Sequence, residues 1–230
     1  GRDADPDHQS LYEVMQHNCD RLLDIVKQIT DIRKIDSGQM VLHPEEHDYV
    51  EYANRVFEQF EGVAKVKEIS FEIEHEEEEL PMMMDTTHFE KIITNLLSNA
   101  FKFTPQGGKV IAKSGIEEND VVLRFYNSGP QLSDEDLQHM WERFYQGSAG
   151  VDANGSGIGL NLVHELVKLH HGSIEARNAE PVGVEFVLHF PYFNGMQANT
   201  DQTRATLLLV DDDMELSNFM STQLGKDYNI

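Results

Sequence analysis

The chain has 230 residues, of which 41 are acidic and 18 are basic, and its formal net charge of -23 disfavours binding to nucleic acids or anionic lipids. A single cysteine, Cys19, excludes an internal disulfide framework and is typical of a reducing compartment. No apolar run reaches the roughly 18 residues that a transmembrane helix needs, so we expect this piece to contact neither membrane nor nucleic acid. A hydrophobic content of 40% supports a packed core.

The first expected element is a helix over about residues 7–36. It carries a seam with spacings of four and three, typical of a helix that packs along another helix: Leu11, Met15, Asn18, Leu22, Ile25, Ile29 and Ile32. Four more apolar residues widen this seam to the width of a helical bundle: Val14, Leu23, Val26 and Ile35. One helix cannot bury such a seam, so we expect a partner helix, either upstream of residue 1 or in a second copy of the chain.

Residues 39–84 are expected to form three short strands and a helix. The strands are predicted over residues 39–43, 69–73 and 80–84, the second from its alternation of apolar and polar residues. The helix is predicted over residues 49–66, with Asp48 as its N-cap. Its core face would be Val50, Ala53, Val56, Phe57 and Phe60.

Residues 85–104 are predicted to form an amphipathic helix with two amides on its polar face. Its apolar residues repeat every three to four positions: Phe89, Ile92, Ile93, Leu96, Leu97 and Ala100. Asn95 and Asn99 lie four apart, and Lys102 follows within one turn. Neutral oxygen ligands beside a cation suit a hydrated magnesium ion bound to phosphate. The alternative is a buried helix with two solvated amides.

The segment from residue 109 to residue 190 alternates strands and helices. We predict two strands, over residues 109–115 and 120–126, joined by a turn at Asn119-Asp120. A helix capped by Ser133 follows over 134–141, then a glycine-rich loop over 146–157 and a helix over 158–170. The last two strands are predicted over 173–178 and 183–190. This order predicts an α+β fold, a two-layer sandwich in which an antiparallel or mixed sheet carries its helices on one face.

The last residues are expected to begin another domain. A polar linker over 194–204 precedes an apolar strand over 205–210, then Asp211, Asp212 and a helix from Met214. A buried strand that ends in aspartates is a common magnesium arrangement in doubly wound folds. Because 26 residues cannot complete such a fold, we expect this domain to be truncated.

Three further motifs follow the asparagine helix. Asn127-Ser128-Gly129 ends a strand, where an amide could read a base edge. An aromatic cluster occupies residues 140–145, and glycines open a helix over residues 155–160, where free backbone amides favour phosphate. Each signal is weak alone, since short glycine motifs are often turns and aromatic clusters are usually core, but the order and spacing together are specific.

With these motifs in this order, residues 8–192 resemble part of a sensor histidine kinase, namely the second helix of its dimerisation domain and its catalytic ATP-binding domain. HFEKIITNLLSNAFKFTP is similar to the asparagine box of that family, NSGPQL to its first glycine box, MWERFYQ to its phenylalanine box and GSGIGL to its second glycine box. LLDIVKQITDIRKIDSGQMVL resembles the second helix of the dimerisation domain. ATLLLVDDDMEL resembles the first strand of a receiver domain, which implies a hybrid kinase.

The resemblance implies roles for particular residues. Asn99 would be the ligand of Mg²⁺, Asn95 and Lys102 would contact the phosphates of ATP, and Asn127 would read the adenine amino group. Asp211 and Asp212 would be the acidic pair of the receiver. The remaining implied ATP-binding residues lie beside the nucleotide, line its pocket or belong to the lid: Phe103, Gly129, Phe144, Gly155, Gly157, Ile158, Gly159 and Leu160.

One position distinguishes transfer from hydrolysis. Related ATPases carry a glutamate four residues before the metal asparagine as general base for water, whereas this chain has Asn95, which cannot accept a proton. Transfer to a nucleophilic histidine is then favoured. The chain also departs from the family pattern: Asn127 replaces the usual Asp, Gln131 replaces a glycine, and Gln146 replaces the basic residue after the phenylalanine box.

The resemblance therefore predicts an ATP- and Mg²⁺-dependent protein-histidine kinase module of a hybrid two-component sensor of bacterial type. Residues 1–38 would be the second dimerisation helix, 39–193 the catalytic domain, 194–204 a linker and 205–230 the truncated receiver. The acceptor histidine would precede residue 1, so autophosphorylation of this piece alone is not expected. Expected partners are a second copy through the seam from Leu11 to Ile32 and its own or a cognate receiver domain.

The same resemblance gives an expected location, the cytoplasmic portion of an inner-membrane sensor. Two alternatives stay open at this point. One is a catalytically silent nucleotide-binding or scaffold module, which Asn127, Gln131, Gln146 and the missing acceptor favour. The other is an ATPase of the same superfamily, which Asn95 disfavours.

Overall fold

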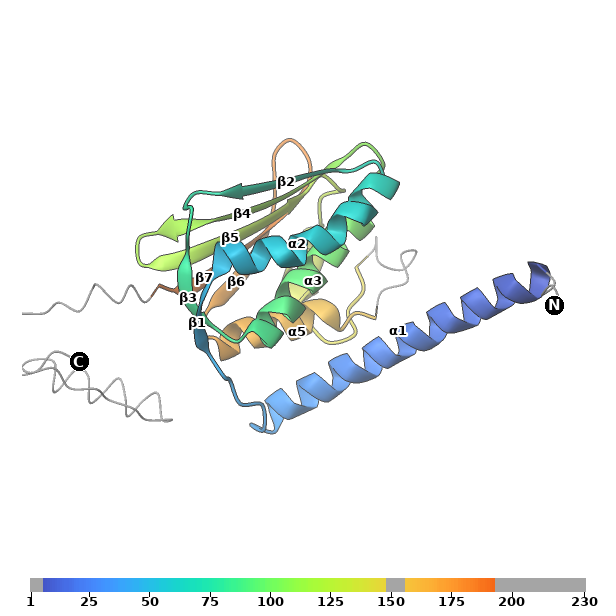
Figure 1. The fold of residues 1–230 in the computed structure, drawn as a ribbon, viewed down its shortest axis with the longest axis horizontal. Helices are drawn as coiled ribbons and strands as arrows, with labels where there is room; N and C mark the ends of the chain where they lie inside the picture. The colour runs from blue at the N-terminus through green and yellow to red at the C-terminus, as the bar shows by residue number, and fades with distance from the viewer. Residues whose placement is uncertain (1–5, 148–155, 193–230) are drawn as a thin grey trace, which may run out of the picture. The chain divides into compact units, whose positions relative to one another are not determined.

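The structure is a computed structural model that describes residues 6–147 and 156–192, without the side chains of residues 6–11, 13, 14 and 17 (Figure 1). The predicted linker and receiver start, with Asp211 and Asp212, therefore lie outside the described residues. So do Gly155 and most of the predicted glycine-rich loop.

A five-stranded mixed sheet forms one layer. Its strand order is β2-β4-β5-β7-β6, with β2 parallel to β4 and every other neighbouring pair antiparallel. The strands are β2 (Ser70–His75), β4 (Lys109–Glu117), β5 (Asp120–Asn127), β6 (Ser173–Asn178) and β7 (Val184–Pro191). A separate antiparallel pair joins β1 (Glu45–Asp48) to β3 (Pro81–Met84).

Three helices form the second layer against one face of the sheet (Figure 1). They are α2 (Tyr49–Val66), α3 (Thr86–Phe103) and α5 (Gly159–Leu169). Local signals fix where α2 and α3 start, because Asp48 and Asp85 accept hydrogen bonds from the first free backbone N–H groups. The predicted α+β sandwich with helices on one face is confirmed.

The helix α1 (Pro6–Asp36) precedes this sandwich and contacts it through its C-terminal half. Ile32 is buried in the core, and three further residues pack partly against it: Ile25, Ile29 and Ile35. Other apolar residues stay exposed, namely Met15, Leu22, Leu23 and Val26. The predicted seam is therefore divided, because the catalytic core of the same chain covers its last turns.

Several predicted boundaries were wrong. Residues 39–44 form no strand, because the N–H groups of Gln39 and Met40 are used to close the end of α1 on the Lys34 carbonyl. The strand starts instead at Glu45, where pairing with β3 begins. The β4–β5 turn is Glu118-Asn119 rather than Asn119-Asp120, since Glu118 takes the left-handed conformation.

The short helix α4 (Asp134–His139) begins at the predicted position, because Ser133 and Asp136 form a reciprocal capping box. It ends two residues earlier than predicted. The predicted alternation of β2 holds for Phe71, which packs on the core, but Ile73 is 37% exposed.

Candidate active site

A cavity of about 870 Å³ opens between α3, the segment after β5, the start of α5 and α1. The structure brings eight of the sequence-predicted site residues to its wall: Asn95, Asn99, Lys102, Phe103, Asn127, Gly157, Gly159 and Leu160. Val184 and Phe186 of β7 add an apolar surface. The cavity therefore joins amides, a cation and apolar side chains, the mixture that a nucleotide requires.

The polar face of α3 supplies the two amides. Asn95 Nδ2 donates a hydrogen bond to the Lys91 carbonyl at 2.7 Å, and this bond fixes the orientation of the amide. The start of α5 approaches closely, because a Cβ on Gly159 would lie 2.6 Å from Asn95 Oδ1. No hydrogen bond to the Asn99 side chain is found within the described part of the chain, so its amide oxygen can bind a ligand.

Two lysines line the cavity near the end of α3. The ammonium group of Lys102 lies 5.0 Å from the centroid of the Phe103 ring. Burial, and then the charge of Arg21, lower the pKa of Lys102. Lys67 also lines the wall, but it donates a hydrogen bond to the Phe101 carbonyl at 2.9 Å and so stabilises the end of the helix.

Asn127 is buried at the end of β5, where its side chain reaches the cavity. Gly129 does not line the cavity but lies just behind it. A Cβ on Gly129 would lie 2.5 Å from the Phe103 carbonyl oxygen and 2.6 Å from Asn127 Nδ2. Only a glycine allows the end of α3 and Asn127 to approach each other at this point.

A backbone hydrogen bond joins the aromatic cluster to the second glycine motif. The Phe144 N–H donates to the Gly157 carbonyl at 2.9 Å, and both residues have positive φ, +65° and +68°. Because a Cβ on Gly157 would lie 2.6 Å from the Phe144 backbone, glycine is required there. Phe144 is 65% exposed and Ile158 is 2% exposed, so neither lines the cavity, and Ile158 belongs to the core.

Sequence reasoning missed one wall of the cavity, which comes from α1: Asp20, Arg21, Asp24, Ile25 and Gln28. Gln28 Oε1 accepts a hydrogen bond at 3.3 Å from Ser156 Oγ, three residues before α5 begins. Arg21, Ile25 and Gln28 follow the i, i+4, i+7 pattern of one helix face, which was readable in the sequence. Nothing in the pattern, however, indicates what that face contacts.

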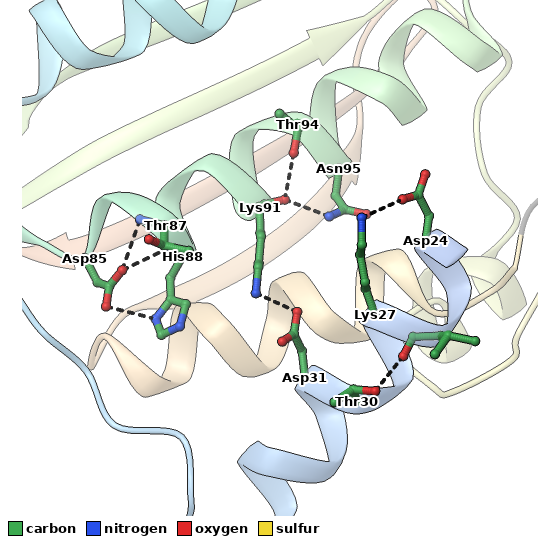
Figure 2. Close-up of polar contacts among 11 residues, drawn as sticks. Asp24, Lys27, Thr30, Asp31, Asp85, Thr87, His88, Lys91, Thr94 and Asn95 are labelled. Carbon is green, nitrogen blue, oxygen red and sulfur yellow. Dashed lines mark hydrogen bonds and ion pairs between the residues drawn. The ribbon is translucent and has the colours of Figure 1, made fainter. Parts of the chain in front are cut away.

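Two ion pairs hold α1 against the sandwich. Lys91 points from α3 toward α1, where its Nζ lies 2.6 Å from Asp31 Oδ2 (Figure 2). Arg143 donates two hydrogen bonds to Asp36, at 2.8 and 2.6 Å. The Arg143 hydrogen bonds also lower the pKa of Asp36, so this pair stays charged well into the acid range. Both ion pairs lie in the last turns of α1, beyond the residues that form the wall, and hold this end of the helix against the sandwich.

The fold and the cavity define a class of protein, which the comparison with known families identifies. Residues 84–194 match the family described as histidine kinase-, DNA gyrase B- and HSP90-like ATPases. The sensor histidine kinase TmoS of Ectopseudomonas mendocina is 35% identical over 183 residues, 78% of this chain and 19% of that protein. The sensor protein EvgS of Escherichia coli is 31% identical over 80% of this chain and 16% of its own length.

Solved structures agree with these sequence relatives. The catalytic domain of histidine kinase ThkA is 26% identical, with a TM-score of 0.60 over 65% of this chain and 96% of that domain. Full-length ShkA, solved in complex with AMPPNP, has a TM-score of 0.72 over 83% of this chain and 40% of the ShkA chain. Because the two sequences are only 20% identical, this match supports the fold alone. The chain carries the catalytic ATP-binding domain of a sensor histidine kinase.

The chain spans only 12 to 19% of the length of the first four curated relatives that it matches. Within the described residues, no helix combines the length and the apolarity that crossing a membrane requires.

Proposed function

We propose that this chain binds ATP with Mg²⁺ in the 870 Å³ cavity and transfers the γ-phosphate to a histidine outside residues 1–230. The observation that carries the proposal is the convergence of Asn95, Asn99 and Lys102 with Asn127 on one cavity. Lys102 would neutralise phosphate charge, and Asn127 would read the adenine edge. Phosphoryl transfer depends mainly on positioning and charge neutralisation, which these groups provide.

The side chains present fit a magnesium ion held through the nucleotide. The Asn99 amide oxygen would be the protein ligand, and bound Mg²⁺ would draw charge from the phosphate oxygens. Asn95 is bonded to the Lys91 carbonyl and has no carboxylate, so it supplies no general base for water. This favours transfer to histidine over hydrolysis by the same domain.

The experiment supplies the full chain with a separate dimerisation domain that bears an acceptor histidine, and follows phosphate transfer from labelled ATP. Asn99→Ala is expected to lower the rate at least about a hundredfold, because it removes the metal ligand. The control, Gln59→Ala, removes an amide from the exposed face of α2 and should leave transfer unchanged. Unchanged transfer in Asn99→Ala would refute the proposal.

The context we propose is a hybrid sensor whose receiver begins near residue 205, with Asp211 and Asp212 as its acidic pair. Histidine kinase P4 of Formosa agariphila, 24% identical over 94% of this chain, supports a relationship that continues past the catalytic domain. A solved structure contains ThkA in complex with the response regulator TrrA. By analogy, we propose a receiver domain as the partner that accepts the phosphate, and the cytoplasmic side of an inner-membrane sensor as the location.

We also propose that the intact protein dimerises through α1. The exposed residues Met15, Leu22, Leu23 and Val26 form an apolar stripe that the described residues leave uncovered. A partner helix from upstream or from a second copy would bury it. Ile25, Ile29 and Ile32 already pack on the catalytic core, so the dimer contact we propose uses the exposed stripe rather than the whole seam from Leu11 to Ile32.

A second candidate is a nucleotide-binding module that transfers no phosphate. Asn127 and Gln146 favour it, since both line the cavity where the family carries charged residues. The two readings separate in the intact protein with its upstream helix. Phosphorylation of that protein supports the kinase, whereas ATP binding without phosphorylation supports the silent module.

A further inference from the structure

The charge of the cavity wall is the starting point. Three cationic side chains line the cavity within the described residues: Arg21, Lys67 and Lys102. Lys67 is committed to the Phe101 carbonyl. Because the chain as a whole carries a net charge of -23, a triphosphate needs local cations to approach this surface at all.

Among the described residues that line the cavity beside the aromatic cluster, none is a cation. The residue that follows the aromatic cluster is Gln146, which lines the cavity as a neutral amide. Asp136 also lines the cavity and accepts a hydrogen bond from Tyr145. Besides Lys102 and Lys67, the described residues that line the cavity include one more cation, Arg21 on the α1 wall.

Arg21 lies on that wall. It is half-buried and lines the same cavity as Asn95, Asn99 and Lys102. The Arg21 charge contributes to the lowered pKa of Lys102, which agrees with two cations at one end of the cavity. One face of α1 leads from Arg21 through Ile25 to Gln28, which is bonded to Ser156.

We infer that Arg21 of α1 binds the phosphates of the nucleotide that this cavity holds, and so completes the ATP site from outside the catalytic sandwich. The inference rests on the proposed function. Arginine is suited to this role, because its planar guanidinium group binds phosphate oxygens through two parallel hydrogen bonds. Asp20 and Asp24 of the same wall repel phosphate, and Arg21 offsets part of that repulsion.

The test measures binding of ATP, ADP and AMP to the full chain by calorimetry in the presence of Mg²⁺. Arg21→Gln should weaken ATP binding about tenfold, ADP less and AMP hardly at all, since a charged hydrogen bond to phosphate is lost. Arg21→Lys should recover part of the loss. Arg33→Gln, on an exposed position of the same helix, is the matched control and should bind all three nucleotides like the unsubstituted chain.

Each outcome decides something. Equal weakening of all three nucleotides would mean that Arg21 only holds α1 in place, and no weakening would mean that it does not reach the phosphates; both overturn the inference. A thermal melting curve of Arg21→Gln checks that this variant is folded, so that weaker binding is not mistaken for unfolding. If Asn99→Ala no longer binds ATP while Arg21→Gln binds it normally, the inference about Arg21 is wrong and the proposed function still stands. If the unsubstituted chain binds no ATP, the proposed function fails too.

Discussion

The helices α1 and α3 face each other across the cavity, and both carry apolar stripes, yet they are stabilised in different ways. Eight residues of α3 are buried, including Phe89, Ile92 and Leu96, because the sheet and two neighbouring helices surround its apolar face. Among the α1 side chains that the structure describes, only Ile32 is buried, while Leu22, Leu23 and other apolar residues stay exposed. The α3 half of the site is therefore stabilised by an extensive buried core, whereas the α1 half depends on a few contacts.

The largest effect should come from removing the same side chain from each helix. Leu96→Ala in α3 is expected to destabilise the chain by about 3 kcal/mol, because it leaves a cavity in a closely packed core. Leu22→Ala in α1 removes a side chain that is 62% exposed and should cost less than about 0.5 kcal/mol. Urea unfolding measures both.

Equal losses in the two variants would contradict this comparison, because they would show that Leu22 is covered in solution. Sedimentation of the Leu22→Ala chain then distinguishes a partner copy from contacts within one chain.

The helix α3 could be predicted closely from sequence because its signals are local. Its apolar period and the two asparagines lie within one stretch of about twenty residues, and the predicted range of 85–104 exceeds the observed helix by only the two capping residues, Asp85 and Thr104. The seam of α1 was just as regular, but a periodic pattern shows only that a face is apolar. Which surface covers Ile25 or Ile29 depends on residues far along the chain, so the division of the seam could not be read in advance.

The same limit applies within the site. Gly157 and Gly159 of the glycine motif both line the cavity. The motif did not show that Ile158, between the two glycines, turns into the core. Nor did it reveal the α1 wall, because Gln28 meets Ser156 only after the chain has folded back over more than a hundred residues.

The close approach of α5 to α3 allows a more specific test. Gly159→Ala places a methyl group 2.6 Å from Asn95 Oδ1, so the amide must rotate and lose its bond to the Lys91 carbonyl. We expect ATP binding to weaken roughly fivefold, the effect of about 1 kcal/mol. Overall stability should change little, because alanine is the better helix former.

Gly62→Ala in α2 is the matched control, since the added Cβ would meet no atom within 4 Å other than the adjacent backbone of its own helix. It should raise stability by about 0.5–1 kcal/mol and leave nucleotide binding unchanged. Unaltered ATP affinity in Gly159→Ala would show that the orientation of Asn95 does not matter to the nucleotide.

The ion pair between Lys91 and Asp31 tests how firmly the two helices are joined. A double-mutant cycle with Lys91→Met and Asp31→Asn should give a coupling energy of about 1 kcal/mol, because the pair is short and only 32% and 15% exposed. Each single variant should also increase hydrogen exchange in the last turns of α1 without changing exchange in α3. A coupling energy near zero would mean that the apolar contacts of α1 alone hold it in place.

The smallest expected effect is that of acid, which should destabilise the catalytic sandwich before it loosens the contacts of α1. His88 of α3 and His170 at the end of α5 are both buried, with ring centroids 5.7 Å apart. Burial lowers both pKa values, although Asp85, with its Oδ2 3.6 Å from His88 Nδ1, acts in the opposite direction. His88 Nδ1 and His170 Nε2 have no hydrogen-bond partner within the described residues.

As the pH falls below about 6.5, the ordinary pKa of histidine, the unfolded chain protonates both side chains while the folded chain keeps them neutral. Proton uptake by the unfolded chain then lowers the stability of the fold. Above about pH 7 both states are neutral at these histidines, so their contribution to stability is constant. We expect the melting temperature to fall a few degrees between pH 7.5 and pH 5.5. His170→Phe should reduce that fall, whereas His189→Gln, on the partly exposed side of β7, should keep it. Since the pKa of Asp36 is lowered by Arg143, exchange protection at the end of α1 should persist over the same range. Loss of that protection together with the core would show that the two halves respond to acid as one unit.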